Sequence, residues 1–256
     1  MEQGAAAGEE DVSGGVEEAW FKGAGAINGA TSSSYTIAAV VDGDAGSYTV
    51  QVSNQAGMVT STPATLTVSA PKAALPTTPD AMLAQGDAWY PLQMARELDD
   101  AILSLRTNEL NIGTWLLRTT GDAALARQSD ELLAAHQAHW FVNETLGMLR
   151  RTLARIDVSS RSLFALIDQG SCFVGTLAEL AFAADRAYML DLPDSPEQAP
   201  RLELTELNLG RFPMVNHQSR LQRRFYEETA PMAQVASVVG QSLDAAKAME
   251  LGLVTS

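Results

Sequence analysis

The pattern of hydrophobic and polar residues changes character near residue 70. Before that point, β-forming residues alternate with small or polar ones in three runs, at 34–41, 47–52 and 59–68. Such alternation, with glycine-bearing turns between the runs, predicts short strands with one face in a core. We therefore expect an all-β segment over residues 20–68.

Beyond residue 87 the pattern is that of helices alternating with short buried strands. Apolar residues recur at helical spacing through 94–105 and again through 142–156, which predicts two amphipathic helices. Short, wholly apolar runs are typical of buried parallel strands. The runs lie at 112–117, 163–167 and 187–190. This order predicts right-handed βαβ units in one α/β domain over 87–256.

Two further segments carry neither pattern. Residues 1–19 are rich in Gly, Ala and Glu and contain no basic residue, so we expect a disordered acidic tail. Residues 69–86 contain Pro71, Pro76 and Pro79, which favours a stiff, extended linker between the two domains.

Composition narrows the possible partners. The formal net charge of −14 argues against nucleic-acid binding, which needs a basic face. No apolar run approaches the roughly 20 residues of a membrane span, and no basic-led apolar start resembles a secretory signal, so we expect a cytoplasmic protein without a membrane partner. A single cysteine, Cys172, and three scattered histidines exclude an internal disulfide and predict no metal site.

Candidate chemistry begins at the segment 168–185. It follows a predicted strand, passes through a glycine-bearing turn and enters an alanine-rich helix. Backbone N–H groups at such a junction can bind a developing oxyanion, although close packing alone produces the same pattern. Two more segments follow, 203–213 and 239–254, separated by a basic stretch with Arg220, Arg223 and Arg224.

Taken in order, these segments resemble the crotonase (enoyl-CoA hydratase/isomerase) superfamily. Glu179-Leu180-Ala181 with Asp185 matches its E-L-A-x-A-x-D block, and Glu206 with Leu209-Gly210 and Pro213 matches its P-E-x-x-L-G-x-x-P block. Residues 240–254 match the G-x-x-x-x-A-x-x-A-x-x-x-G-L-V ending. The resemblance implies an α/β fold of the ClpP/crotonase type.

Within the superfamily, residues 140–155 and 157–167 resemble a lyase more than a hydratase. The implied reaction is hydrolytic C–C ring cleavage of 2,3-dihydro-2,3-dihydroxybenzoyl-CoA, with release of formate, in aerobic benzoate degradation. The resemblance implies an acyl-CoA thioester as substrate, no cofactor besides the CoA that the substrate carries, and a homo-oligomer at full length.

The same resemblance assigns the site. The amide of Thr176, flanked by Gly175, would be one oxyanion donor, and the second, which we do not assign, would lie near 127–129. Glu179 and Glu206 would be the acid/base pair. We therefore predict that both carboxyl groups converge on one cavity that also receives the Thr176 N–H.

Alternatives without chemistry stay open at each position. Glu179 and Glu206 could face solvent, and Cys172 is expected to be a packing residue. The three arginines would suit CoA phosphates, but pairing with Glu227 and Glu228 is the preferred interpretation in so acidic a chain.

A departure from the family pattern favours a rival function. Gly175-Thr176-Leu177 replaces the family's G-G-G, and the chain matches only the second of two tandem crotonase-like units and ends at Ser256. The rival is a non-catalytic structural or interaction module, the supporting half of a tandem enzyme joined to an adhesive domain. Whether the two parts form a natural fusion stays open.

The N-terminal β segment has a resemblance of its own. Residues 20–23, 44–48 and 52–57 resemble strands C, E, F and G of a bacterial immunoglobulin-like domain, with Tyr48 as its tyrosine corner. Val50 stands where the second core cysteine is often found. Nothing before Trp20 resembles strands A and B, so we expect a partial immunoglobulin-like sandwich that is unstable alone.

Overall fold

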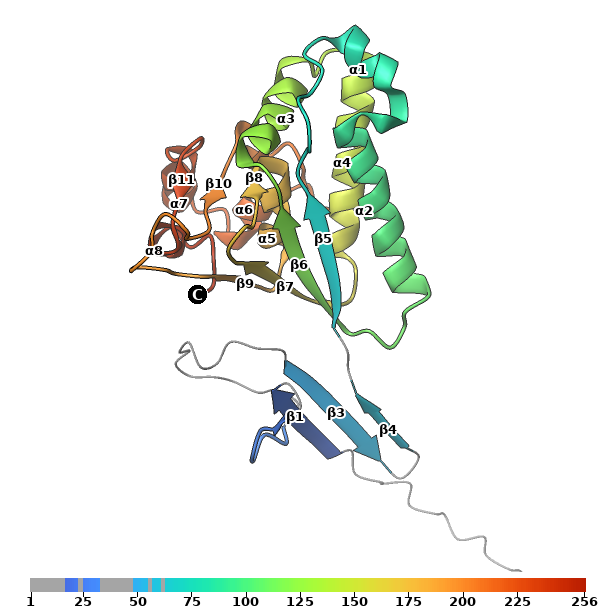
Figure 1. Ribbon diagram of the computed structural model, residues 1–256, viewed down its shortest axis with the longest axis vertical. Helices are drawn as coiled ribbons and strands as arrows, with labels where there is room; N and C mark the ends of the chain where they lie inside the picture. Colours follow the sequence, from blue (N-terminus) through green and yellow to red (C-terminus); the bar gives the residue numbers. More distant parts are fainter. Residues whose placement is uncertain (1–16, 23–24, 33–47, 55–56, 61–62) are drawn as a thin grey trace, which may run out of the picture. The chain divides into compact units, whose positions relative to one another are not determined.

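The computed structural model describes residues 17–22, 25–32, 48–54, 57–60 and 63–256. The chain separates into two compact units, Met1–Pro63 and Ala64–Ser256, drawn in Figure 1. Of the predicted disordered tail over 1–19, residues 1–16 lie outside the described residues, as does the strand predicted at 34–41. Residues 17–19 belong to a strand, so the predicted end of the tail at residue 19 is wrong.

In the first unit the strands form an antiparallel sheet in the order β2-β1-β3-β4. The strands are β1 (Glu17–Lys22), β2 (Gly25–Ala26), β3 (Tyr48–Asn54) and β4 (Gly57–Thr60). The strand predicted at 47–52 is therefore present as β3. The immunoglobulin-like sandwich stays a prediction, because residues 44–47 and the side chain of Tyr48 lie outside the description.

The predicted domain boundary at residue 68 is wrong. The run 59–68 holds two strands, of which β5 (Ala64–Ser69) belongs to the second unit. It pairs in parallel with β6 (Thr114–Thr120), with Val68 opposite Thr119. Pro63 lies between β4 and β5, and proline cannot donate to a sheet ladder. The all-β segment therefore ends at Pro63.

The predicted linker over 69–86 is also partly wrong. It contains helix α1 (Pro79–Gln85), whose first position is proline and whose N-cap oxygen, from Thr78, accepts the N–H of Ala81 at 3.4 Å. Proline suits the first helical position, where its missing N–H costs nothing. Met82 is fully buried, so the segment packs on the α/β core. The short 3-10 turn η2 (Gly86–Ala88) then leads into the next helix.

A parallel sheet in the order β5-β6-β7-β9 forms the centre of the second unit, as the α/β prediction required. Strands β7 (Ser162–Ile167) and β9 (Arg186–Met189) cover the predicted apolar runs. Their alternate residues face a core that includes Trp115, Leu117 and Ala165, all fully buried.

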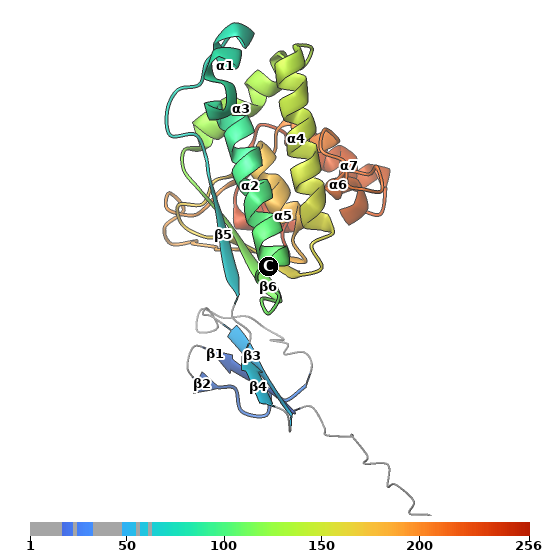
Figure 2. The same ribbon diagram turned by 90° about the vertical axis from the view of Figure 1, so that its right-hand side faces the viewer.

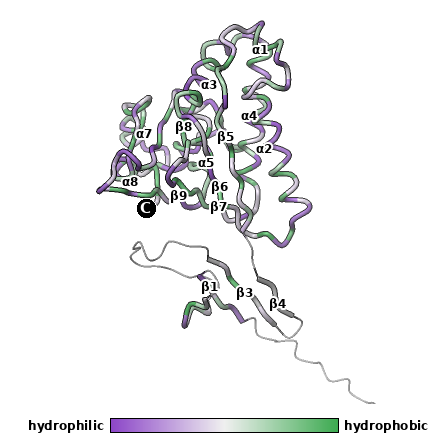
Figure 3. The backbone as a smooth tube through the Cα atoms, viewed as in Figure 1, coloured by the Kyte–Doolittle hydropathy of each residue, from purple (hydrophilic) through white to green (hydrophobic). Residues whose placement is uncertain are grey.

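Helices α2 (Tyr90–Thr107) and α4 (Trp140–Asp157) lie side by side (Figure 2), where the Thr152 hydroxyl donates to the Ala95 carbonyl at 3.3 Å. Hydrophobic and hydrophilic stretches alternate along both (Figure 3), as expected of helices with one buried face. Helix α3 (Ala123–Ala135) connects β6 to α4. No helix in the described part of the chain has an apolar stretch long enough to cross a bilayer.

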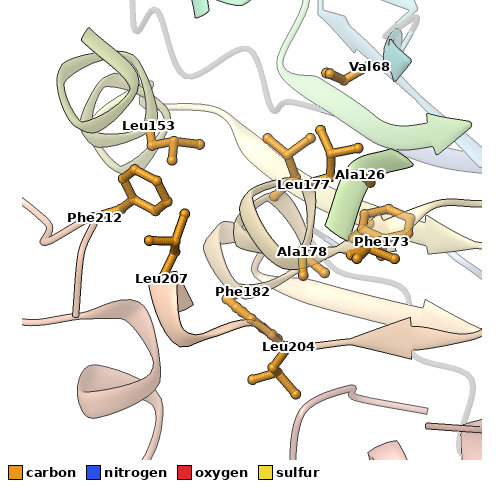
Figure 4. Close-up of a cluster of buried hydrophobic side chains, with 14 of the residues drawn as sticks. Val68, Ala126, Leu153, Phe173, Leu177, Ala178, Phe182, Leu204, Leu207 and Phe212 are labelled. Carbon is orange, nitrogen blue, oxygen red and sulfur yellow. The ribbon is translucent and has the colours of Figure 1, made fainter. Parts of the chain in front are cut away.

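The remaining elements surround a second, three-stranded sheet in the order β11-β10-β8. Its side chains and those of the adjoining short helices form one apolar cluster (Figure 4), to which Phe173, Leu177 and Leu204 contribute. The strands are β8 (Phe173–Val174), β10 (Leu202–Glu203) and β11 (Ser242–Leu243). The helices and 3-10 turns are η3 (Gly175–Ala178), α5 (Glu179–Ala183), η4 (Glu206–Leu209), α6 (Arg220–Arg224), α7 (Thr229–Ala236) and α8 (Ala245–Glu250).

Candidate functional site

The strand-to-helix junction at Gly175 brings the backbone against a buried carboxylate. Gly175 begins η3 with φ at +53°, a conformation that side chains rarely adopt. A Cβ at this position would lie 1.9 Å from Oδ2 of Asp130. Glycine is therefore required here both by the backbone conformation and by the approach of Asp130 from α3.

Asp130 accepts three hydrogen bonds at this junction. The Thr176 N–H donates to Oδ2 at 2.8 Å and the Thr176 hydroxyl to Oδ1 at 2.6 Å. The Thr205 hydroxyl donates to Oδ2 at 2.7 Å. Asp130, Thr176 and Thr205 are all buried. The amide that we predicted as an oxyanion donor therefore already binds an anion, which belongs to the protein itself.

The electrostatics of Asp130 reflect a balance between burial and these donors. Burial raises the pKa of its carboxyl group to about 6, although the bonds from Thr176 and Thr205 act in the opposite direction. The nearby Glu179 also raises the pKa slightly by repulsion. The junction thus holds a carboxylate that titrates closer to neutrality than an ordinary aspartate.

The region expected to supply the second oxyanion donor does not offer one. Residues 127–129 lie inside α3, where backbone N–H groups are used by the helix. The Arg127 side chain instead forms an ion pair with Glu203, with Nη2 and Oε2 2.7 Å apart. Residues 127–129 follow β6 along the chain, but they lie within helix α3.

Glu179, at the start of α5, is buried and fully engaged. Its Oε1 accepts from Asn208 Nδ2 at 2.7 Å, and its Oε2 accepts from Arg220 Nη1 at 2.8 Å. Arg220 also binds Asp157 through Nη2 at 2.7 Å. Burial raises the pKa of Glu179 and the charge of Arg220 opposes that rise. The alternative of a solvent-facing Glu179 is therefore wrong.

The expected pairing of the basic stretch with Glu227 and Glu228 is wrong as well. Arg220 is 2% exposed and is held between Glu179 and Asp157. Arg224 donates through Nε to the Gly252 carbonyl at 2.6 Å, while the Arg223 guanidinium lies 5.9 Å from the Tyr226 ring centroid. In the described part of the chain none of the three forms an ion pair with either glutamate.

Glu206 behaves differently from Glu179. It is the first residue of η4 and is exposed, whereas the next two residues, Leu207 and Asn208, are buried. A small cavity lies beside Thr176 and Asp130, with Tyr90, Met94 and Leu177 among its walls, and neither Glu179 nor Glu206 lines it. This cavity does not bring the two glutamates together with the Thr176 N–H, and their catalytic roles stay predictions.

Sequence reasoning missed the residues that organise this junction, namely Asp130, Asp157, Thr205 and Asn208. One signal was available for Asp130. The buried positions of α3 are Ala126, Ser129, Asp130 and Leu133, a helical stripe that places the aspartate on the core-facing side. A charged residue on such a stripe needs a buried partner set.

Cys172 is buried, and burial raises the pKa of its thiol to about 11, which agrees with the expected packing role. Among the described residues, no three His, Cys, Asp or Glu side chains are grouped so that they could hold a metal ion.

The strand-to-helix junction lies in an α/β unit with a parallel four-stranded sheet, and the chain is similar in sequence to a known lyase. Over 192 residues the chain is 58% identical to the benzoyl-CoA-dihydrodiol lyase of Aromatoleum evansii. The match covers 75% of this chain and 34% of the relative, so the chain spans about a third of the relative's length. The sequence resemblance to a lyase is thereby confirmed over these 192 residues. No family model matches the chain.

Solved structures show a weaker likeness. An enoyl-CoA hydratase from Geobacillus kaustophilus has a TM-score of 0.46 and 18% identity over 77% of this chain and 66% of its own. An enoyl-CoA hydratase/isomerase family protein from Silicibacter pomeroyi has a TM-score of 0.45 and 15% identity, covering 76% of this chain and 71% of its own. Both TM-scores are below 0.5, so the α/β fold is assigned from the sheet topology of this chain.

Proposed function

We propose that this chain is part of a carbon–carbon lyase that acts on a CoA thioester. The proposed reaction is hydrolytic ring cleavage of 2,3-dihydro-2,3-dihydroxybenzoyl-CoA with release of formate. The observation that carries this proposal is the 58% identity over 192 residues to a benzoyl-CoA-dihydrodiol lyase. Because that match covers 34% of the relative, the activity is proposed for the whole enzyme.

For this unit within the enzyme, the geometry favours the supporting role. An oxyanion site needs N–H donors that are free and directed at the reacting oxygen. Here the Thr176 N–H is bound to Asp130, and both oxygens of Glu179 are bound to Asn208 and Arg220. A thioester oxygen would have to displace a hydrogen-bonded internal carboxylate. We propose that the unit stabilises the enzyme and that the reacting thioester carbon lies in another part of it.

The remaining expectations belong to the same proposal. It includes no cofactor beyond the CoA of the substrate, a homo-oligomer at full length, a cytoplasmic location, and no nucleic-acid or membrane partner. The net charge of −14 supports the exclusion of nucleic acid. The adhesive role of the first unit has no support from the described strands.

The role of this unit can be tested by measuring formate release. The chain would be incubated with the CoA thioester of the dihydrodiol, and formate would be followed by a coupled dehydrogenase assay. In parallel, the Aromatoleum evansii lyase would be assayed with the glutamate equivalent to Glu206 changed to glutamine. We expect background formate release from the chain alone and nearly unchanged turnover in the lyase variant, because the exposed Glu206 lies outside the cavity at Thr176.

Turnover by the chain alone would contradict the supporting role. So would a loss of about a hundredfold or more in the lyase variant, which is the usual contribution of a general acid or base. Wild-type lyase that releases no formate from this substrate would instead contradict the proposed reaction.

A further inference from the structure

A cleft lies on the surface of the second unit, between α4 and the segment 210–213. Its volume is about 400 Å³, within the range of small-molecule sites. One wall is a face of α4 and the other is the segment 210–213. The residues that line it are Asn143, Glu144, Leu146, Gly147, Arg150, Arg151, Gly210, Arg211 and Pro213.

The cleft gathers positive charge on an acidic protein. Three arginines line it, against the single carboxylate of Glu144. Elsewhere among the described residues, six arginines form ion pairs with Asp or Glu. Arg150, Arg151 and Arg211 have no such ion pair with any described residue. In a chain of net charge −14, three guanidinium groups without carboxylate partners in one cleft indicate a site for an external anion.

Local structure holds two of these arginines in place. A Cβ at Gly147 would lie 3.5 Å from Arg151 Nη1, so the guanidinium lies over the glycine, along the helix surface. Its Nη2 is 3.6 Å from the Met148 sulfur. These contacts hold the exposed Arg151 against the surface of α4 beside the cleft.

Arg211 is positioned by the core beneath it. The adjacent Phe212 is 2% exposed and lies near Leu153 of α4 and Leu207 in the apolar cluster (Figure 4). The Arg211 N–H donates to the Leu207 carbonyl at 3.0 Å. The backbone of the segment is thereby fixed beside α4, with Arg211 half-buried at the cleft.

We propose that this cleft binds a diphosphate group. Guanidinium groups bind phosphate oxygens bidentately and are more weakly hydrated than ammonium groups. Three of them exceed what one phosphomonoester needs and suit two linked phosphates. Such a group occurs in free nucleoside diphosphates and in CoA, and the site is independent of whether this unit performs chemistry.

The test is isothermal titration of the whole chain with pyrophosphate, ADP, CoA and inorganic phosphate. We expect binding of pyrophosphate, ADP and CoA, and weaker binding of inorganic phosphate. The variants Arg150→Gln, Arg151→Gln and Arg211→Gln should each weaken pyrophosphate binding by on the order of tenfold, the usual effect of losing one charge-assisted hydrogen-bonded contact. Arg186→Gln is the matched control, since Arg186 is exposed, forms no ion pair with a described residue and does not line the cleft.

Equal affinity in the Arg186→Gln and Arg211→Gln variants would overturn the proposal, since the anion would then respond only to net charge. The proposal would also be overturned if pyrophosphate did not bind. It would be overturned as well if Arg211→Gln changed the oligomeric state while no anion bound to the chain. Tighter binding of CoA than of ADP and pyrophosphate would identify CoA as the source of the diphosphate. Each result is obtained without formate release, so this test and that of the proposed function fail independently.

Discussion

At the scale of single residues, the internal carboxylate of Asp130 is the main determinant of the candidate site. Three donors satisfy it, from Thr176 and Thr205, yet burial still raises its pKa to about 6. Removing a carboxylate from water costs more than these bonds recover. The Asp130 carboxylate therefore accepts the hydrogen bonds that the junction offers to an anion. Because its pKa is raised in the fold, ionisation of this carboxyl group lowers the stability of the folded state.

This residue makes the stability of the second unit depend on pH. The pKa of Asp130 is about 6 in the fold against an ordinary value of 3.8. Its contribution to the free energy of unfolding is therefore fully present below the ordinary value and is lost as the pH rises through about 6. Between these limits we expect wild-type stability to fall relative to Asp130→Asn by on the order of 2–3 kcal/mol, from about 1.4 kcal/mol per pKa unit.

Urea unfolding at several pH values, followed by tryptophan fluorescence, measures this difference. The Asp191→Asn variant is the control for the loss of one carboxylate, since Asp191 is exposed. A constant difference between wild type and Asp130→Asn across this range would contradict the raised pKa.

At the scale of elements, the sequence predicted most of the α/β unit. Strands β6, β7 and β9 were foreseen because apolar runs between helical patterns have few other structures available. Strand β5 was assigned to the wrong unit, because its alternation is the same in an antiparallel and a parallel sheet. The parallel pairing of Val68 with Thr119, which lies far along the chain, shows that β5 belongs to the second unit.

The candidate site was harder to predict for a related reason. Gly175, Thr176 and Glu179 were assigned from the resemblance to a family motif, and all three lie at the junction. Their partners Asp130 and Arg220 come from distant helices, and no local pattern indicates which buried charges will meet. The motif residues therefore form a strand-to-helix junction, while their hydrogen-bond partners come from parts of the chain that the motif does not contain.

The membership of β5 in the α/β unit predicts a specific pattern of stability. Val68→Asn should lower the free energy of unfolding of this unit by about 2–4 kcal/mol, because it places an amide in the core. Thr67→Asn is the matched control, since Thr67 is exposed on the neighbouring position of the strand. Near-UV circular dichroism of Trp89 and Trp115, both fully buried, reports unfolding of this unit during urea titration. Equal stability of the two variants would contradict the assignment.

At the scale of the whole molecule, the second unit contains a buried junction at Thr176 and an arginine-lined cleft on α4. The junction around Thr176 is closed by the protein's own carboxylate, and the arginine cleft on α4 is open. The chain spans about a third of the lyase that it matches. We propose that a unit whose Thr176 N–H is bound by its own Asp130 acts as a structural partner for a catalytic unit, and that its cleft binds the phosphates of a ligand.

The most direct test of this account is anion rescue of Asp130→Ala. This substitution leaves the N–H and hydroxyl of Thr176 and the hydroxyl of Thr205 without an acceptor, so it should destabilise the second unit by about 2 kcal/mol or more. We expect formate or acetate to restore part of the lost thermal stability, when compared with chloride at equal ionic strength, and to leave the wild type unchanged. Two results would contradict the account: an Asp130→Ala variant as stable as the wild type, or one whose thermal stability is not raised by formate or acetate. Either result would mean that the Asp130 carboxylate does not occupy an anion site at Thr176.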